Sequence, residues 1–84
     1  MSNLTTETFL NCIELLKQIG RQNNLPQLVI TAEEVHKLVG GYPGKNHRMP
    51  MCCNAMFKSM REGDEILHST PSKQSNTTKI KYYL

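Results

Sequence analysis

The chain has 84 residues, enough for one domain and too few for two, so we expect a single domain over residues 1–84. Its composition, 38% hydrophobic and 20% charged, is that of an ordinary globular protein and excludes the disordered and fibrous classes. The net charge is +3, with the excess positive charge after residue 30, which permits a polyanionic partner without requiring one.

The first expected element is a helix from Thr5 to about Gln22, preceded by a short tail, residues 1–4. Thr5 is a suitable N-cap, and Leu4 before it can pack on the residue at position 9 as a hydrophobic staple. The apolar residues recur at the three- to four-residue spacing of one buried face: Phe9, Cys12, Ile13, Leu16 and Ile19. The charged residues, Lys17 among them, are expected mostly off that face. Pro26 closes the segment.

A brief strand and a second helix are expected next. The apolar run at 28–30 has the size of one short strand. Thr31-Ala32-Glu33-Glu34 is a capping box, in which the Thr31 hydroxyl and the Glu34 carboxylate each bind the other's backbone N–H. It predicts a helix over 32–39 that continues through Val35, Leu38 and Val39, with Gly40-Gly41 as a left-handed stop.

A third helix is expected over 50–62, after a loop at 42–49 that is rich in turn formers and basic residues. Pro50 suits its first turn, where the missing N–H would have no helical partner. Gly63 ends the helix at about residue 62. The apolar side of this helix carries Cys52, Cys53, Met56 and Met60.

The remaining residues predict a β-hairpin with arms over 65–69 and 77–84 and a polar turn over 70–76. In the second arm, alternate residues have the period of a half-buried strand. The inward set is Thr78, Ile80, Tyr82 and Leu84.

This order of elements, with the Thr31–Glu34 cap on the second helix and Gly63-Asp64-Glu65-Ile66-Leu67 leading into the hairpin, resembles the winged helix-turn-helix family over residues 5–84. The resemblance implies an α+β winged-helix fold with three helices, a short strand after the first helix and a C-terminal two-stranded wing. The connection over 40–49 departs from the family, because it is much longer than the three- or four-residue turn of simple helix-turn-helix units.

The resemblance implies that the helix over 50–62 enters the major groove of duplex DNA and that 70–76 is the wing. Cations there would neutralise phosphates, while Arg and Asn can make bidentate contacts with guanine and adenine. The candidate DNA-binding residues are Lys45, Asn46, His47, Arg48, Asn54, Lys58, Arg61, Lys73, Gln74 and Asn76. The alternative interpretation of the same residues is that they are solvated polar groups on loops and on an exposed helix face.

The expected function is therefore that of a small, non-enzymatic transcriptional regulator that binds double-stranded DNA. We expect a homodimer, because one module of this size offers about 600–1,000 Å² of contact. The alternative is a winged helix that serves as a protein–protein interaction module or adaptor, which the long 40–49 loop and the low net charge favour. Met51 and Phe57 fall partly off the apolar stripe and are the candidates for pairing two copies or meeting a protein partner.

Neither a catalytic site nor a metal site is expected, and no cofactor. Structural zinc sites space paired ligands by two to four residues, and the adjacent Cys52 and Cys53 do not fit that spacing. The cysteines, Cys12 included, fall on apolar stripes, where a free thiol packs as a small hydrophobic group. A nucleophilic thiol beside His47 would lack an orienting third group and a pocket.

We expect a cytoplasmic protein without membrane association. No apolar run approaches the ~18 residues needed to cross a bilayer. Met1 to Thr8 is polar and lacks the basic and apolar regions of a signal peptide. Three cysteines, two of them adjacent, fit free thiols in a reducing compartment better than a disulfide framework.

Overall fold

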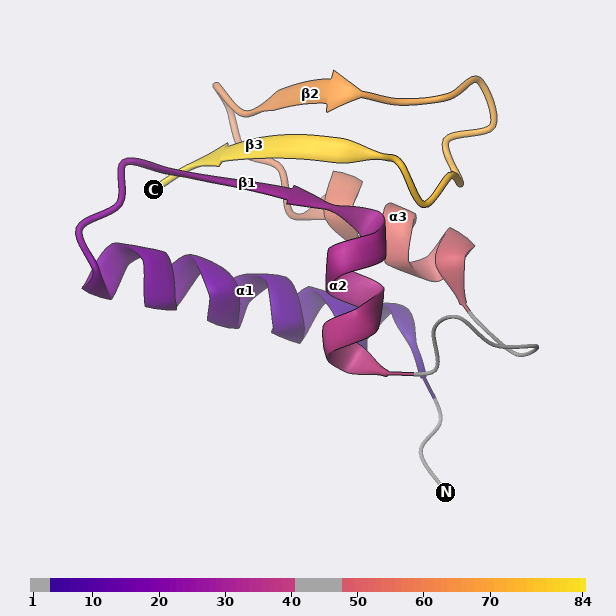
Figure 1. Cartoon of the computed structure of the whole chain (residues 1–84), viewed down its shortest axis with the longest axis horizontal. Coiled ribbons are helices and arrows are strands. Elements are labelled where there is room, and N and C mark those ends of the chain that lie inside the picture. The colour runs from indigo at the N-terminus through magenta and orange to yellow at the C-terminus, as the bar shows by residue number, and fades with distance from the viewer. Residues whose placement is uncertain (1–3, 41–47) are drawn as a thin grey trace.

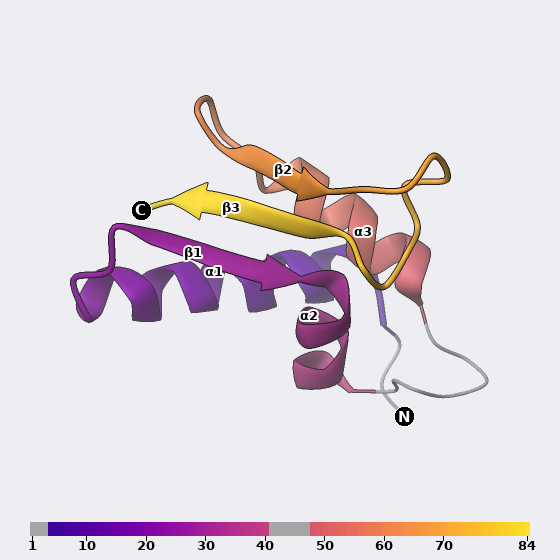
Figure 2. The same ribbon diagram turned by 45° about the horizontal axis from the view of Figure 1, so that its top comes forward.

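The computed structural model describes residues 4–40 and 48–84. Within these ranges the chain forms a small α+β fold with three helices and one antiparallel sheet. The elements in order are α1 (Thr6–Gln22), β1 (Gln27–Thr31), α2 (Ala32–Val39), α3 (Met49–Lys58), β2 (Glu65–His68) and β3 (Lys79–Tyr83). In Figures 1 and 2, α1 lies along the direction of the strands, and α2 and α3 stand at the other end of the molecule from the C-terminus.

The three strands form a sheet in the order β1-β3-β2. The predicted hairpin is confirmed as the antiparallel pair β2–β3, in which Ile66 lies opposite Ile80. Strand β1 pairs with the other edge of β3, with Leu28 opposite Tyr82. The alternation predicted for the last strand is also confirmed, since Thr78, Ile80 and Tyr82 are fully buried.

Both predicted N-caps are present, and they define the starts of α1 and α2. The Thr31 hydroxyl accepts the Glu34 N–H at 3.2 Å, and the Glu34 carboxylate accepts the Thr31 N–H at 3.0 Å. Thr5 and Thr8 make the equivalent reciprocal pair at the start of α1. Each cap uses N–H groups that would otherwise have no partner in the first helical turn, so the starts are fixed locally.

The predicted burial is wrong at three positions. Ile19 and Leu38 are 45% and 64% exposed, because they lie at the flanks of the apolar faces of α1 and α2. Lys17, expected off the apolar face of α1, is 1% exposed because α3 packs on that side. Its Nζ donates a 2.7 Å hydrogen bond to the Ser59 carbonyl and lies 4.5 Å from the centre of the Tyr82 ring.

The predicted end of the third helix at residue 62 is also wrong, because α3 ends at Lys58. Two distant side chains take the carbonyls near its C-terminus: the Tyr82 hydroxyl donates to the Met56 carbonyl at 2.7 Å, and the Lys17 ammonium donates to the Ser59 carbonyl. The Met60 N–H donates to the Phe57 carbonyl, three residues back, at 3.2 Å, which is the tighter bond common at the end of a helix.

The core lies between the helices and the inner face of the sheet. Cys52 and Cys53 are free and fully buried in it, as predicted from the apolar stripe. In the two described ranges, no helix combines the length and the apolar character that crossing a bilayer requires.

The loop between β2 and β3 is anchored at its base to both α2 and α3. The Ala32 N–H donates to the Thr78 carbonyl at 2.9 Å, and the Glu33 N–H donates to the Asn76 carbonyl at 3.1 Å. The Cys53 thiol donates to the Ser75 carbonyl at 3.3 Å. These bonds hold the outer part of the loop, residues 70–74, beside α3.

Candidate nucleic-acid interface

The start of α3 is held in place by a buried histidine on α2. The His36 Nε2 accepts the Arg48 N–H at 2.9 Å, and its Nδ1 lies 3.1 Å from the Gly40 carbonyl. Since a carbonyl only accepts and an amide N–H only donates, these two bonds fit an imidazole that donates from Nδ1 and accepts at Nε2. The Phe9 ring packs edge-on against it, with the centroids 5.0 Å apart. The imidazole therefore fixes Gly40 and Arg48, the residues on either side of 41–47.

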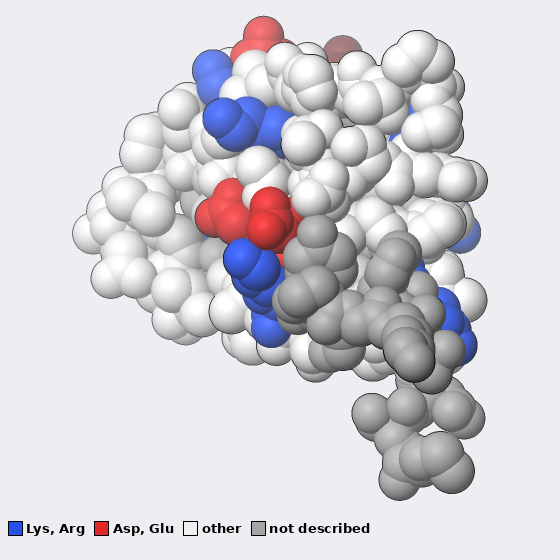
Figure 3. Space-filling view, turned by 45° about the vertical axis from the view of Figure 1, so that its right-hand side comes forward, with Lys and Arg blue, Asp and Glu red and all other residues white. Residues whose placement is uncertain are grey.

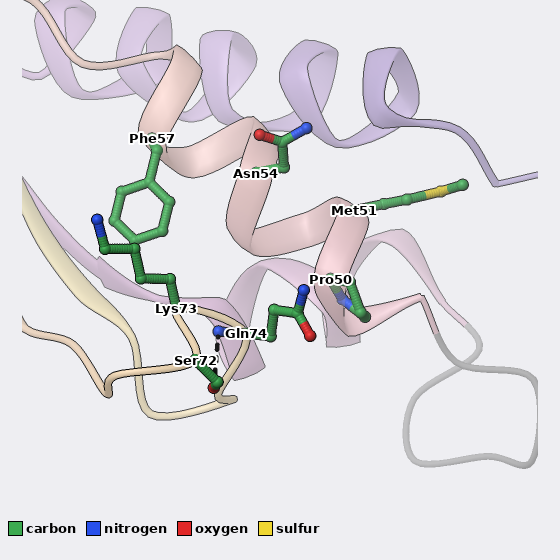
Figure 4. A pocket seen from close by; sticks show the side chains of 7 residues that line it. All are labelled: Pro50, Met51, Asn54, Phe57, Ser72, Lys73 and Gln74. Carbon is green, nitrogen blue, oxygen red and sulfur yellow. Dashed lines mark hydrogen bonds between the residues drawn. The ribbon is translucent and has the colours of Figure 1, made fainter.

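An open groove of about 410 Å³ lies between the outer side of α3 and the β2–β3 loop (Figure 4). It is lined by Pro50, Met51, Asn54 and Phe57 from α3 and by Ser72, Lys73 and Gln74 from the loop. In Figure 4 the Gln74 side chain points from the loop toward Pro50. We refer to these seven residues as the α3–loop groove.

Hydrogen bonds within the loop give it its shape at the groove. The Ser72 hydroxyl accepts the Gln74 N–H at 3.3 Å, and the Lys73 N–H donates to the Thr70 carbonyl at 2.9 Å. Lys73 has a φ of 58°, in the left-handed region that a tight turn requires. This turn directs its side chain toward α3.

Three of the predicted DNA-binding residues meet in this groove: Asn54, Lys73 and Gln74. Two others lie at the ends of α3, with exposed Arg48 as its N-cap residue and exposed Lys58 as its last residue. Arg48 makes a further interaction besides the bond to His36. Lys45, Asn46 and His47 lie outside the described residues.

The remaining two predicted residues do not line the groove. Arg61 lies beyond α3, in a turn in which its N–H donates to the Asp64 carboxylate at 2.8 Å. Asn76 is at the base of the loop, where its carbonyl accepts the Glu33 N–H and its side-chain oxygen accepts from the Ser75 hydroxyl at 3.5 Å. The position of Asn76 depends on a long-range bond to α2, whereas Arg61 is held by a local turn with Asp64.

The charge on the described surface is dispersed. Lys37 pairs with Glu33 at 3.1 Å and Lys81 with Glu65 at 3.4 Å, whereas Lys58 and Lys73 form no salt bridge with any described residue. On the face drawn in Figure 3, basic side chains stand apart, with uncharged surface and acidic side chains between them. None of the seven residues of the α3–loop groove is acidic, so the groove itself is compatible with an anion.

A second open hollow, of about 370 Å³, lies beside the start of α2. Its lining includes Glu33 and His68, together with Thr31, Asn76, Thr77 and Lys79. Among residues 4–40 and 48–84 no three His, Cys, Asp or Glu side chains gather closely enough to hold a metal ion. A carboxylate in its wall makes this hollow less suitable for an anionic partner than the α3–loop groove.

The two thiols on the inner side of α3, Cys52 and Cys53, are held in their neutral form. Burial, with smaller contributions from the neighbouring thiols, raises the pKa of Cys52 to about 12, and burial also raises the pKa of Cys53. The Cys52 thiol donates to the Ala32 carbonyl at 3.4 Å. Since the thiolate is the nucleophilic form, these groups serve packing at neutral pH.

The sequence interpretation did not identify His36 as a positioning residue. The available signal was its place four residues before Gly40, a spacing that puts an imidazole against the carbonyl ending that helix. Comparisons of this chain with protein-family models, with curated proteins and with solved structures give no match.

Proposed function

We propose that this chain is a winged-helix, non-enzymatic DNA-binding protein that contacts duplex DNA with α3 as the recognition helix and residues 70–76 as the wing. The observation that carries the proposal is the α3–loop groove, which Asn54, Lys73 and Gln74 line from two segments distant in sequence. A groove that has polar and basic groups but no carboxylate favours a polyanionic partner.

The division of α3 into two sides supports this role. Cys52, Cys53 and Met56 are buried on the inner side and fix the helix in the fold. The outer side carries Met51 and Asn54, which are exposed. An α-helix with its side chains is about 10–12 Å in diameter, so α3 can lie in the major groove of B-DNA, which is about 12 Å wide.

The cations at the two ends of α3 and at the tip of the loop fit contacts with phosphates. Arg48 precedes the first turn, Lys58 ends the last one, and Lys73 is at the turn of the wing. Phosphate contacts set the register of a protein on the duplex, and base contacts set its specificity. We assign Arg48, Lys58 and Lys73 to phosphate contacts.

The proposal extends to a homodimer that regulates transcription in the cytoplasm. A single module of this size provides about 600–1,000 Å² of contact, so two copies on adjacent half-sites provide the area typical of specific complexes. Sedimentation of the protein–DNA complex gives its stoichiometry, for which we expect two chains per duplex; one chain per duplex would remove the dimer from the proposal.

The proposal is tested by measuring duplex binding as a function of salt. We expect affinity to fall steeply between about 50 and 200 mM salt, because cations displace counterions from phosphates. Lys58→Ala with Lys73→Ala should weaken binding to all duplexes and lower the salt slope by about two. Lys37→Ala, on α2 and paired with Glu33, is the matched control and should change neither. No salt-dependent binding to any duplex would overturn the proposal.

A protein-interaction module is the second candidate, favoured by exposed apolar side chains away from the groove. Leu15 and Ile19, one turn apart on α1, are 57% and 45% exposed, and Leu38 on α2 is more exposed still. Replacing Leu15 and Ile19 with Ser separates the two functions. Under the DNA proposal the variant binds duplexes like the unsubstituted chain; under the alternative it loses self-association or partner binding while duplex binding is absent throughout.

A further inference from the structure

The α3–loop groove has an unusual combination of side chains for a surface with basic residues around it. Two of its seven residues are carboxamides, Asn54 and Gln74, and three are apolar, Pro50, Met51 and Phe57. Ser72 and Lys73 complete the lining. Neither an arginine nor a carboxylate is among the seven.

These side-chain types match one kind of base pair. In the major groove, adenine presents an acceptor at N7 and a donor at N6, a pattern that a carboxamide meets with two hydrogen bonds. Thymine presents a methyl group, which apolar side chains contact. Guanine is usually contacted by arginine or lysine, and cytosine by a carboxylate. Lys73 is the one lining residue of a type that contacts guanine, whereas two carboxamides and three apolar residues match A·T pairs. The lining of the groove therefore matches A·T pairs better than G·C pairs.

The two carboxamides are available for such contacts. Within the described residues, neither the Asn54 nor the Gln74 side chain makes a hydrogen bond, and both residues are exposed. Two other carboxamides are used within the fold: Asn23 Nδ2 donates to the Ile19 carbonyl at 2.8 Å, and the Asn76 side chain accepts from Ser75. The carboxamides of the groove are thus free to bind a partner, whereas those of Asn23 and Asn76 are used within the fold.

The position of Asn54 on α3 places apolar groups on both sides of its carboxamide. Pro50 and Met51 precede it by four and three residues and Phe57 follows it by three, so all lie on the same side of the helix. Figure 4 shows Met51 and Asn54 extending from α3 in different directions, with Gln74 approaching Pro50 from the loop. A carboxamide flanked by apolar atoms fits an adenine beside a thymine methyl group.

From this arrangement we infer that the α3–loop groove recognises A·T base pairs through the major groove, with Asn54 and Gln74 contacting adenine and Pro50 and Met51 contacting the thymine methyl. Lys73 remains the phosphate contact at the edge of the groove. The inference rests on the proposed duplex binding and adds the class of sequence that is bound.

The test uses three pools of duplexes of about 20 base pairs, the span of two half-sites, with identical flanks. The central pairs are random A·T in the first pool, random G·C in the second and inosine·cytosine in the third. Inosine lacks the guanine amino group, so its pair resembles A·T in the minor groove and G·C in the major groove. We expect preference for the first pool, and equally weak binding to the second and third.

Variants then assign the preference to residues. Asn54→Ala should reduce the ratio of A·T to G·C affinity by roughly 5- to 100-fold, the effect of losing one bidentate base contact. Gln74→Ala should reduce it as well, and replacing thymine by uracil should weaken binding of the unsubstituted chain, because the methyl group is lost. Gln18→Ala removes an exposed carboxamide from α1 and is the matched control.

The outcomes separate the inference from the proposed function. Salt-dependent binding of equal strength to all three pools would overturn the A·T assignment and leave duplex binding intact. Binding to the inosine pool as tight as to the A·T pool would overturn the assignment to the major groove. No binding to any pool would overturn both. Preference for A·T that survives Asn54→Ala and Gln74→Ala together would remove these residues from the readout.

Discussion

The inner and outer sides of α3 differ in how their side chains are used. On the inner side, Cys52 and Cys53 are fully buried, and both thiols donate to carbonyls of neighbouring segments. On the outer side, Asn54 is exposed and its carboxamide has no hydrogen bond within the described residues. One helix therefore carries the stability of the fold on one side and the proposed recognition on the other. Substitutions on the two sides should have separable effects.

The largest loss of stability is expected from Tyr82→Ala. The ring is fully buried, its hydroxyl donates to the Met56 carbonyl, and the Lys17 ammonium lies over its face. Large-to-small changes at such positions cost about 3–5 kcal/mol. Urea denaturation measures the loss, and Tyr82→Phe, which removes only the hydroxyl, should cost about 1–2 kcal/mol. A cost below about 1 kcal/mol for the alanine variant would show that β3 does not close the core against α3.

The next largest effect is expected from His36→Ala. Loss of the imidazole leaves a cavity beside Phe9 and removes the acceptor of the Arg48 N–H, for a cost of about 2–4 kcal/mol. His36 fixes the first turn of α3, so the alanine variant should also bind duplex DNA more weakly. Binding is measured at a temperature below the denaturation midpoint of the variant. His36→Gln, which keeps an acceptor and a donor, is the control and should recover part of both. Unchanged stability in the alanine variant would exclude the proposed role.

A smaller effect is expected from raising the pH. Burial raises the pKa of the thiols and of Tyr82. In alkaline solution these groups therefore keep their protons in the folded chain and lose them in the unfolded chain. Their contribution to stability is complete below the unfolded thiol value near 9 and is lost as the pH rises toward the folded value of about 12 for Cys52. Burial lowers the pKa of Lys17, so its contribution to stability increases with pH. This one group opposes the three thiols and Tyr82.

The loss from Cys52 should be on the order of 1 kcal/mol at about pH 10. Denaturation curves at pH 7, 9 and 10 measure it. Cys53→Ala lowers stability at every pH by leaving a small cavity, and it should also make the decline with pH shallower. A free energy of unfolding that stays constant or rises between pH 8 and pH 10 would contradict the burial of these groups.

The smallest effect on stability is expected from Asn54→Ala and Lys73→Ala on the outer side. Because neither side chain has a hydrogen bond or salt bridge within the described residues, each change should stay within about 0.5 kcal/mol. Duplex binding should fall nevertheless. Thermal denaturation and binding isotherms on the same samples compare the two. If binding and stability fell together, the two sides of α3 would not be independent.

Features encoded by neighbouring residues were predictable from the sequence. The reciprocal bonds of Thr31 and Glu34 lie within four residues, so the start of α2 followed from the capping pattern. The end of α3 did not, and the carbonyls there are bound by Lys17 and Tyr82, which are 42 and 26 residues away in the sequence. The exposure of Ile19 and Leu38 depends in the same way on which neighbours pack against each helix.

Some of the candidate DNA-binding residues line the groove and others do not. Asn54, Lys73 and Gln74 were chosen for their chemistry, and the hairpin brings the last two beside α3. Arg61 and Asn76 were chosen on the same grounds but lie in a turn and at the base of the loop. The long-range hydrogen bond from the Glu33 N–H to the Asn76 carbonyl fixes Asn76, and a local turn with Asp64 fixes Arg61. Sequence patterns identify the residue types of a surface but not which of them meet.

The central claim, that the outer side of α3 and residues 70–76 form one DNA-binding surface, is tested most directly by titrating the labelled chain with duplex DNA and following its backbone amide resonances. The claim predicts that the largest shifts fall on α3 and on residues 70–76, with the amides around Leu15 and Ile19 unchanged. Shifts concentrated on α1, or no shifts at any duplex concentration, would contradict it.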